Sequence, residues 1–208
     1  MILRIHGITV ELSFPLIAVM TAVILFDSSL SVTVCFIAVI LHESGHLLAL
    51  RHYGSIPKHF SITLFDIAIK DKSKDHRTAG KELVIVLSGI ISNLVFALIS
   101  YLLYRSTGNL FFEKELYANL TLAIFNALPI DSLDGGQALF ILLCKAADPD
   151  RALRILDIIS IIFLIPTACL GFIVLLQSKY NFTLLLTALY LFCSILMRHS
   201  KTDFRVHS

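Results

Sequence analysis

The sequence predicts an all-α polytopic membrane protein with six transmembrane helices, and three observations support this prediction. Apolar residues make up 57% of the 208 residues, only 15% are charged, and the mean hydropathy is +0.84. Soluble domains are about half apolar and about a quarter charged. The apolar residues form runs of the length, about 20 residues, that a helix needs to cross a bilayer. The basic residues fall almost entirely into alternate loops between these runs.

Six apolar runs are long enough to be spans, and we expect them to form a single domain over residues 1–208. They cover about 10–27, 30–50, 82–104, 115–144, 153–176 and 181–198. The fourth run is broken by Pro129, Asp131 and the pair Gly135-Gly136. Non-helical backbone is tolerated at membrane depth only where protein surrounds it or where it lines a polar cavity. A functional site is the expected reason for this break.

The lysine and arginine residues orient the spans. Of the 17, 14 lie in the N-terminus, the 51–81 and 145–154 segments and the C-terminal tail, whereas 3 lie in the loops on the opposite side. Because loops rich in basic residues stay in the cytoplasm, both termini are predicted to be cytoplasmic. Between spans two and three, residues 60–69 partly alternate and are rich in β-branched and aromatic residues. This pattern predicts a short strand-like segment or a hairpin.

The second apolar run contains His42-Glu43-Ser44-Gly45-His46. On a helix, histidines at i and i+4 share one face and can bind one Zn²⁺, and the glutamate is the usual general base for a metal-bound water. The alternative is a pair of helix histidines whose polar atoms are satisfied by neighbours in a polar cluster. Ionisable residues are costly at membrane depth and rarely persist there without a role, which favours the metal site.

A catalytic zinc site needs a third protein ligand. The histidine pair lies five to nine residues before Arg51, about 7–14 Å deep, and Asp134 lies eleven residues before Lys145, about 16 Å deep at 1.5 Å per helical residue. Asp134 is therefore the candidate at a similar depth, while Asp131 lies slightly farther out and Asp66 lies in the strand-like segment. Asp134 also precedes a resuming helix and could instead be its N-cap residue, and the two roles are compatible.

Two motifs together resemble the signatures of the site-2 protease family of intramembrane zinc metalloproteases. The family pairs H-E-x-x-H with N-x-x-P-x(4)-D-G on a later span, and the segment from Asn126 to Gly135 matches the second motif. Their order, separation and membrane context agree over most of residues 1–144. Within the family, the small six-span form with a cytoplasmic loop after span two is similar to the sporulation protease that processes a membrane-associated pro-sigma factor.

The resemblance implies one zinc ion per chain, bound by His42, His46 and Asp134, with Glu43 as the catalytic acid and base. Asn126 matches the family asparagine near the active site, where it could hold the substrate backbone or the developing oxyanion. It could equally satisfy free backbone groups of the interrupted helix. The implied activity is hydrolysis of a peptide bond in or near a transmembrane segment of a membrane-tethered protein. Such regulated intramembrane proteolysis would act on a pro-sigma or anti-sigma factor in the bacterial cytoplasmic membrane, with inhibitory membrane proteins as further partners.

Two departures from the family pattern concern helix shape and regulation. The segment 89–93 resembles the family element G-P-x-x-N, with Ile90 in place of the proline. Gly89 and Asn93, four residues apart on one face, are expected to serve close packing and interhelical hydrogen bonding. The chain ends ten residues after Arg198. We therefore expect no C-terminal regulatory nucleotide-binding module of the paired cystathionine-synthase-like type that sporulation members often carry.

The competing function is a metal-binding or metal-transporting membrane protein that uses the same ligands as a transit site. A transporter needs ligands along a path across the membrane, whereas the ionisable residues here cluster at one depth. The net charge of +2 and the lack of a basic patch exclude nucleic acid as a predicted partner. The predicted partners are the lipid bilayer and the membrane-tethered substrate.

Overall fold

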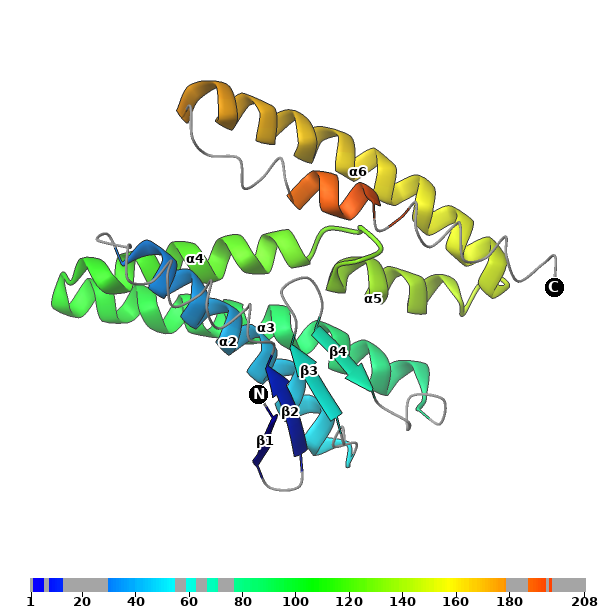
Figure 1. Ribbon diagram of the computed structural model, residues 1–208, viewed down its shortest axis with the longest axis horizontal. Helices are drawn as coiled ribbons and strands as arrows, with labels where there is room; N and C mark the ends of the chain where they lie inside the picture. The colour runs from blue at the N-terminus through cyan, green and yellow to red at the C-terminus, as the bar shows by residue number, and fades with distance from the viewer. Residues whose placement is uncertain are drawn as a thin grey trace. The chain divides into compact units, whose positions relative to one another are not determined.

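The computed structural model describes residues 2–5, 8–12, 30–54, 59–62, 67–70, 77–178, 187–193 and 195 (Figure 1). The chain divides into two compact units, Met1–Ile124 and Phe125–Ser208. The predicted single domain over 1–208 stays a prediction.

The first unit contains a four-stranded sheet in the order β1-β2-β3-β4 (Figure 1). The two N-terminal strands pair antiparallel, β2 runs parallel to β3, and β3 pairs antiparallel with β4. In register, Thr9 lies opposite His59, which in turn lies opposite Lys70. The strands are β1 Ile2–Ile5, β2 Ile8–Leu12, β3 His59–Ile62 and β4 Ile67–Lys70.

The sheet corrects two sequence-based predictions. The strand-like segment after span two is confirmed by β3 and β4, but β1 and β2 were not predicted, so the all-α class is wrong for the N-terminus. The first span cannot begin at residue 10, because β2 continues to Leu12. Periodicity cannot separate a short strand from the start of an apolar helix when the apolar run continues, which explains the error. Residues 13–29 of that span lie outside the described residues.

The first unit also contains the helices α2 Ser31–His52 and α3 Ala79–Thr107, together with α4 Leu110–Asn126 up to Ile124. Both α2 and α3 are long and apolar enough to cross a membrane, and they coincide with the predicted spans 30–50 and 82–104. The sequence ends α3 at Gly108, whose φ of 66° suits glycine and whose amide bonds the Tyr104 carbonyl. Asn109 then accepts the Phe111 amide at 2.9 Å and starts α4.

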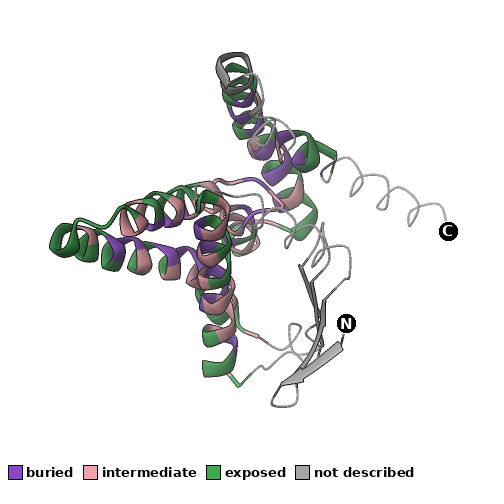
Figure 2. Ribbon diagram, turned by 60° about the vertical axis from the view of Figure 1, so that its left-hand side comes forward, coloured by how far each residue is buried: buried purple, intermediate pink, exposed green. Residues whose placement is uncertain are grey.

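The two spans α2 and α3 approach closely because small residues face each other. Gly45 lies on the buried side of α2, and a Cβ there would stand 2.5 Å from the Ser88 carbonyl oxygen of α3. The hydroxyl of Ser92 on α3 donates to the Leu41 carbonyl of α2 at 2.7 Å. Close backbone approach through small residues, with hydroxyls bonding across, is the usual way in which membrane helices pack. Buried residues line one side of each helix, purple in Figure 2.

The second unit contains α5 Asp134–Leu143, α6 Pro149–Ser178 and a helical stretch at 187–193. Its buried apolar cluster joins the segment before α5 to α6 and the last stretch through Ile130, Leu133, Leu164, Ala188 and Leu191. The α6 helix is apolar enough to cross a membrane over Pro149–Ile173, in agreement with the predicted span 153–176.

The six-span count stays a prediction. Helix α4 ends at Asn126 and α5 begins at Asp134, so residues 127–133 between them are not helical. This segment overlaps the predicted break at 129–136 only in part, because Gly135 and Gly136 are already in α5. Of the predicted last span, the described residues at 187–193 are helical, and most of the others lie outside the described part of the chain.

Replacing Gly45 with alanine is expected to lower the free energy of unfolding by about 1–3 kcal/mol, because the new Cβ overpacks against the α3 backbone. The measurement is thermal unfolding of the purified protein in detergent micelles. The matched control is Gly80→Ala, since Gly80 is the second residue of α3 and a Cβ there meets nothing within 4 Å. Equal melting temperatures for the two variants would contradict the proposed close contact of α2 and α3.

Candidate metal centre

His42 and His46 lie one turn apart on α2 and direct their rings at the same point. Their Nε2 atoms are 3.2 Å apart, and the ring centroids are 4.9 Å apart in an edge-to-face arrangement. A tetrahedral zinc with Zn–N distances of 2.0–2.1 Å requires its ligand atoms to be about 3.3 Å apart. The spacing of the two Nε2 atoms therefore suits two ligands of one ion.

The tautomer of His46 is set by helix α3. Its Nδ1 lies 2.8 Å from the Ile85 carbonyl oxygen. A carbonyl oxygen only accepts, so Nδ1 carries the proton, and Nε2 keeps the lone pair that a metal needs. The Ser88 hydroxyl donates to the same carbonyl at 2.6 Å and lies 3.4 Å from Nδ1. Neither group was predicted from the sequence, because a backbone carbonyl leaves no side-chain signal.

Gly89 on α3 forms the floor beneath the two imidazoles. A Cβ at this position would collide with His46 Nε2 and would stand 2.7 Å from Cε1 of His42. The sequence-based expectation of close packing at Gly89 is confirmed, and the packing partners are the metal-ligand candidates themselves. The expected hydrogen bond of Asn93 is not found: its fully buried side-chain amide makes no hydrogen bond to any described residue.

Asp134 is the first residue of α5, in the second unit. The N-cap of α5 is Leu133 and Asp134 is the first helical residue, so the alternative prediction that Asp134 is the N-cap residue is wrong. A carboxylate in the first helical turn is favoured by the positive end of the helix dipole.

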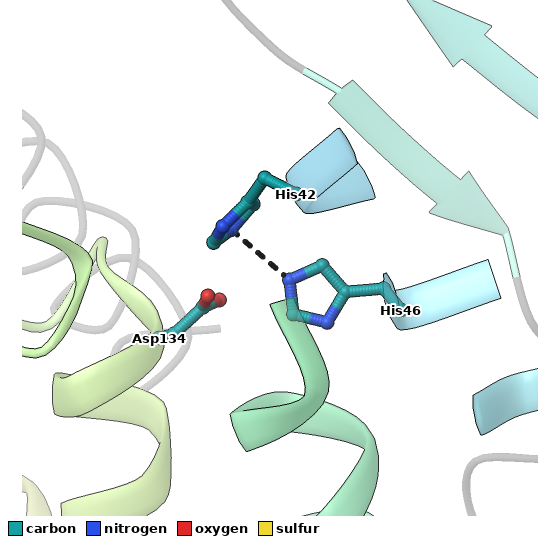
Figure 3. A group of neighbouring side chains, drawn as sticks. All are labelled: His42, His46 and Asp134. Atoms are coloured by element: carbon teal, nitrogen blue, oxygen red, sulfur yellow. Dashed lines mark hydrogen bonds between the residues drawn. The ribbon is translucent and has the colours of Figure 1, made fainter. Parts of the chain in front are cut away.

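Figure 3 shows His42, His46 and Asp134 together. One ring nitrogen of each histidine and one carboxylate oxygen of Asp134 lie within 4.8 Å of one another. Two imidazole nitrogens and one carboxylate oxygen are a usual ligand set for catalytic zinc, which keeps a fourth position open. The donor set therefore fits this metal.

The other predicted site residues flank these ligands along the chain. Glu43 follows His42 on α2 and is half-buried. Asn126 is half-buried and is the last residue of α4, and both of its predicted roles stay predictions.

Two known proteins are similar to this chain over most of its length. Over 203 residues the chain is 24% identical to the Stage IV sporulation protein FB of Bacillus subtilis (strain 168). This alignment covers 96% of this chain and 68% of that protein. A solved structure, the Site-2 Protease from Methanocaldococcus jannaschii, has the same fold, with a TM-score of 0.63 and 21% identity. The alignment covers 95% of this chain and 94% of that one. No family model matches the chain.

Replacing Gly89 with alanine is expected to weaken zinc binding about 10- to 100-fold, the usual effect of disturbing a group that orients a metal ligand. The physical reason is that the new methyl group displaces both imidazoles from their shared point. Competition of the purified variant against a zinc chelator measures the affinity. Gly80→Ala on the same helix is the control and should bind zinc as the wild type does. Unchanged affinity in Gly89→Ala would refute this role of the glycine.

Proposed function

We propose that the chain is a zinc endopeptidase of the site-2 protease family and acts in regulated intramembrane proteolysis, on the basis of its motifs and its similarity to two known proteins. It is an integral membrane protein, and it hydrolyses a peptide bond in or near a transmembrane segment of a membrane-tethered protein. The observation that carries the proposal is the pair of histidine Nε2 atoms, 3.2 Å apart on an apolar helix, with a carboxylate oxygen in reach.

His42, His46 and Asp134 are the proposed ligands of one zinc ion per chain. When bound, zinc supplies a Lewis acid that polarises the scissile carbonyl and lowers the pKa of water toward neutrality. His46 presents its Nε2 lone pair because the Ile85 carbonyl holds the proton on Nδ1. The two imidazoles need no rearrangement to bind, since their nitrogens already have the separation of two ligands.

Glu43 is the proposed acid and base of the reaction. It takes the proton of the attacking water and returns a proton to the leaving amine. Its place next to His42 on α2 keeps the carboxylate within one helical turn of the two histidine ligands. Asn126 is proposed to bind the substrate backbone or the developing oxyanion, and a neutral amide donor suits either task.

The substrate must be unwound at the cleavage site, because a helical peptide bond is shielded and hydrogen-bonded. Among the described strands, β4 lies at one end of the sheet and pairs with β3. We propose that an extended substrate peptide pairs with its other edge. Addition of a substrate strand to this edge would hold the unwound segment through main-chain hydrogen bonds. Substrates proposed from the resemblance are a membrane-associated pro-sigma factor or an anti-sigma factor.

The domain organisation, membrane location and regulators of the chain are part of the same proposal. Residues 1–208 form one catalytic domain of six spans with the fourth broken, in the bacterial cytoplasmic membrane with both termini in the cytoplasm. Inhibitory membrane proteins are proposed as regulators. The alternative, a metal transporter or a metal-binding membrane protein, is not favoured by either similar protein.

Replacing Glu43 with glutamine is expected to reduce cleavage at least about 100-fold, because glutamine cannot take the proton of water. Zinc binding should persist, since the three proposed ligands remain. The measurement uses liposomes that contain the protein and a single-span substrate, with cleavage followed on gels and zinc counted by atomic absorption.

Glu113→Gln is the matched control, because Glu113 is also a glutamate but lies in the first turn of α4, a different helix from the one that carries His42 and His46. Its cleavage rate should equal that of the wild type. Two results together would refute the protease proposal: the wild type still cleaves in a strong chelator, and Glu43→Gln cleaves at the wild-type rate.

A further inference from the structure

Ser160 lies in the middle of α6, outside both family motifs, and is fully buried. Its hydroxyl oxygen accepts a hydrogen bond from the Asp131 amide at 3.0 Å. The same hydroxyl donates to the Pro129 carbonyl at 3.4 Å. We propose that Ser160 is a positioning residue for the third zinc ligand, Asp134, and that it acts by fixing the non-helical segment that leads into α5. This inference rests on the proposed function.

The backbone hydrogen bonds of residues 127–133 show why this contact matters. Three amides of the segment find carbonyls nearby in the chain: Leu128 bonds Phe125, Ile130 bonds Leu128, and Leu133 bonds Ile130. The Asp131 amide instead uses a side chain 29 residues away. An unsatisfied amide is strongly disfavoured at membrane depth, because no water replaces the partner. The Ser160 hydroxyl meets this requirement of the segment.

Apolar packing places the same part of α6 against the segment. Leu164 follows Ser160 by one helical turn, so both side chains lie on one face of α6. Leu164 packs in the buried cluster that contains Ile130 and Leu133. The segment is thus held on both sides of Asp131 by apolar contacts, and at Asp131 itself by the serine hydroxyl.

The backbone at Asp131 packs directly against the first turn of α5. A Cβ on Gly136 would stand 2.7 Å from the Asp131 nitrogen and would collide with the Ile130 carbonyl. Gly136 lies two residues after Asp134, in the same first turn of α5. A shift of the segment toward or away from α6 therefore moves the start of α5, and the Asp134 carboxylate with it.

The test compares Ser160→Ala with Thr167→Val in the full-length protein purified in detergent. Alanine removes the hydroxyl without adding volume. Thr167 is the matched control, because it is also buried on α6 but, within the described part of the chain, its hydroxyl bonds the Phe163 carbonyl of its own helix. Zinc affinity is measured by chelator competition, and the Asp134→Ala variant and the double variant Ser160→Ala/Asp134→Ala complete a cycle.

Ser160→Ala should weaken zinc binding about 10-fold or more, within the range for groups that orient a ligand, while Thr167→Val stays within about twofold of the wild type. In the Asp134→Ala background, Ser160→Ala should cause no further loss, because the ligand that it positions is gone. Affinity within about twofold of the wild type, or the same loss in both backgrounds, would overturn the positioning role.

A second readout separates this inference from the proposed function. Hydrogen exchange of the metal-free protein, followed by mass spectrometry, should be faster in Ser160→Ala over residues 127–136 and unchanged over α3. Unchanged exchange at 127–136 would overturn the inference whether or not zinc binds. If the wild type binds no zinc, or Asp134→Ala binds it as well as the wild type, the proposed function fails, and the exchange result alone decides whether Ser160 holds the segment.

Discussion

The close approach of α2 and α3 is the constraint on which the proposed metal centre depends. Gly45 and Gly89 leave no side chain between the two backbones, so the α3 backbone can reach the α2 histidines. The same contact gives His46 its hydrogen-bond partner, the Ile85 carbonyl. A bulkier residue at either glycine would move the α3 carbonyl and the imidazoles apart. Packing and ligand orientation are therefore one feature of this helix pair, as expected where polar groups must find partners inside the protein.

The segment before α5 depends on a second set of hydrogen bonds to backbone groups. Non-helical backbone at membrane depth needs partners for its amides and carbonyls, and Ser160 supplies two of them. Each half of the proposed zinc site thus depends on a neighbouring apolar helix, α3 for the histidines and α6 for the aspartate segment. Both supports act through hydrogen bonds to backbone groups. Because backbone groups provide much of this support, the proposed site needs few polar side chains, even in a largely apolar chain.

Much of the fold and the three residues of the candidate metal site could be predicted from the sequence, for physical reasons that also explain what was missed. Histidines one helical turn apart have a fixed spacing, so His42 and His46 are recognisable as a candidate ligand pair from their positions alone. The spans α2, α3 and α6 follow from apolar length. Strand β2 pairs with β3, about fifty residues later, and such a non-local contact leaves no local pattern. The Ile85 carbonyl has no sequence signature, and a single serine in an apolar span such as Ser160 does not stand out among other small polar residues.

Zinc K-edge X-ray absorption of the purified chain tests the central claim, a single zinc held by two histidines and one carboxylate, most directly. The account predicts one zinc per chain, with only nitrogen and oxygen neighbours at about 2.0–2.2 Å and the outer-shell scattering of two imidazoles. Replacing Asp134 with alanine should remove one oxygen neighbour or release the metal. A sulfur neighbour at about 2.3 Å, as a thiolate such as Cys144 would give, or a spectrum unchanged by loss of Asp134, would contradict the account.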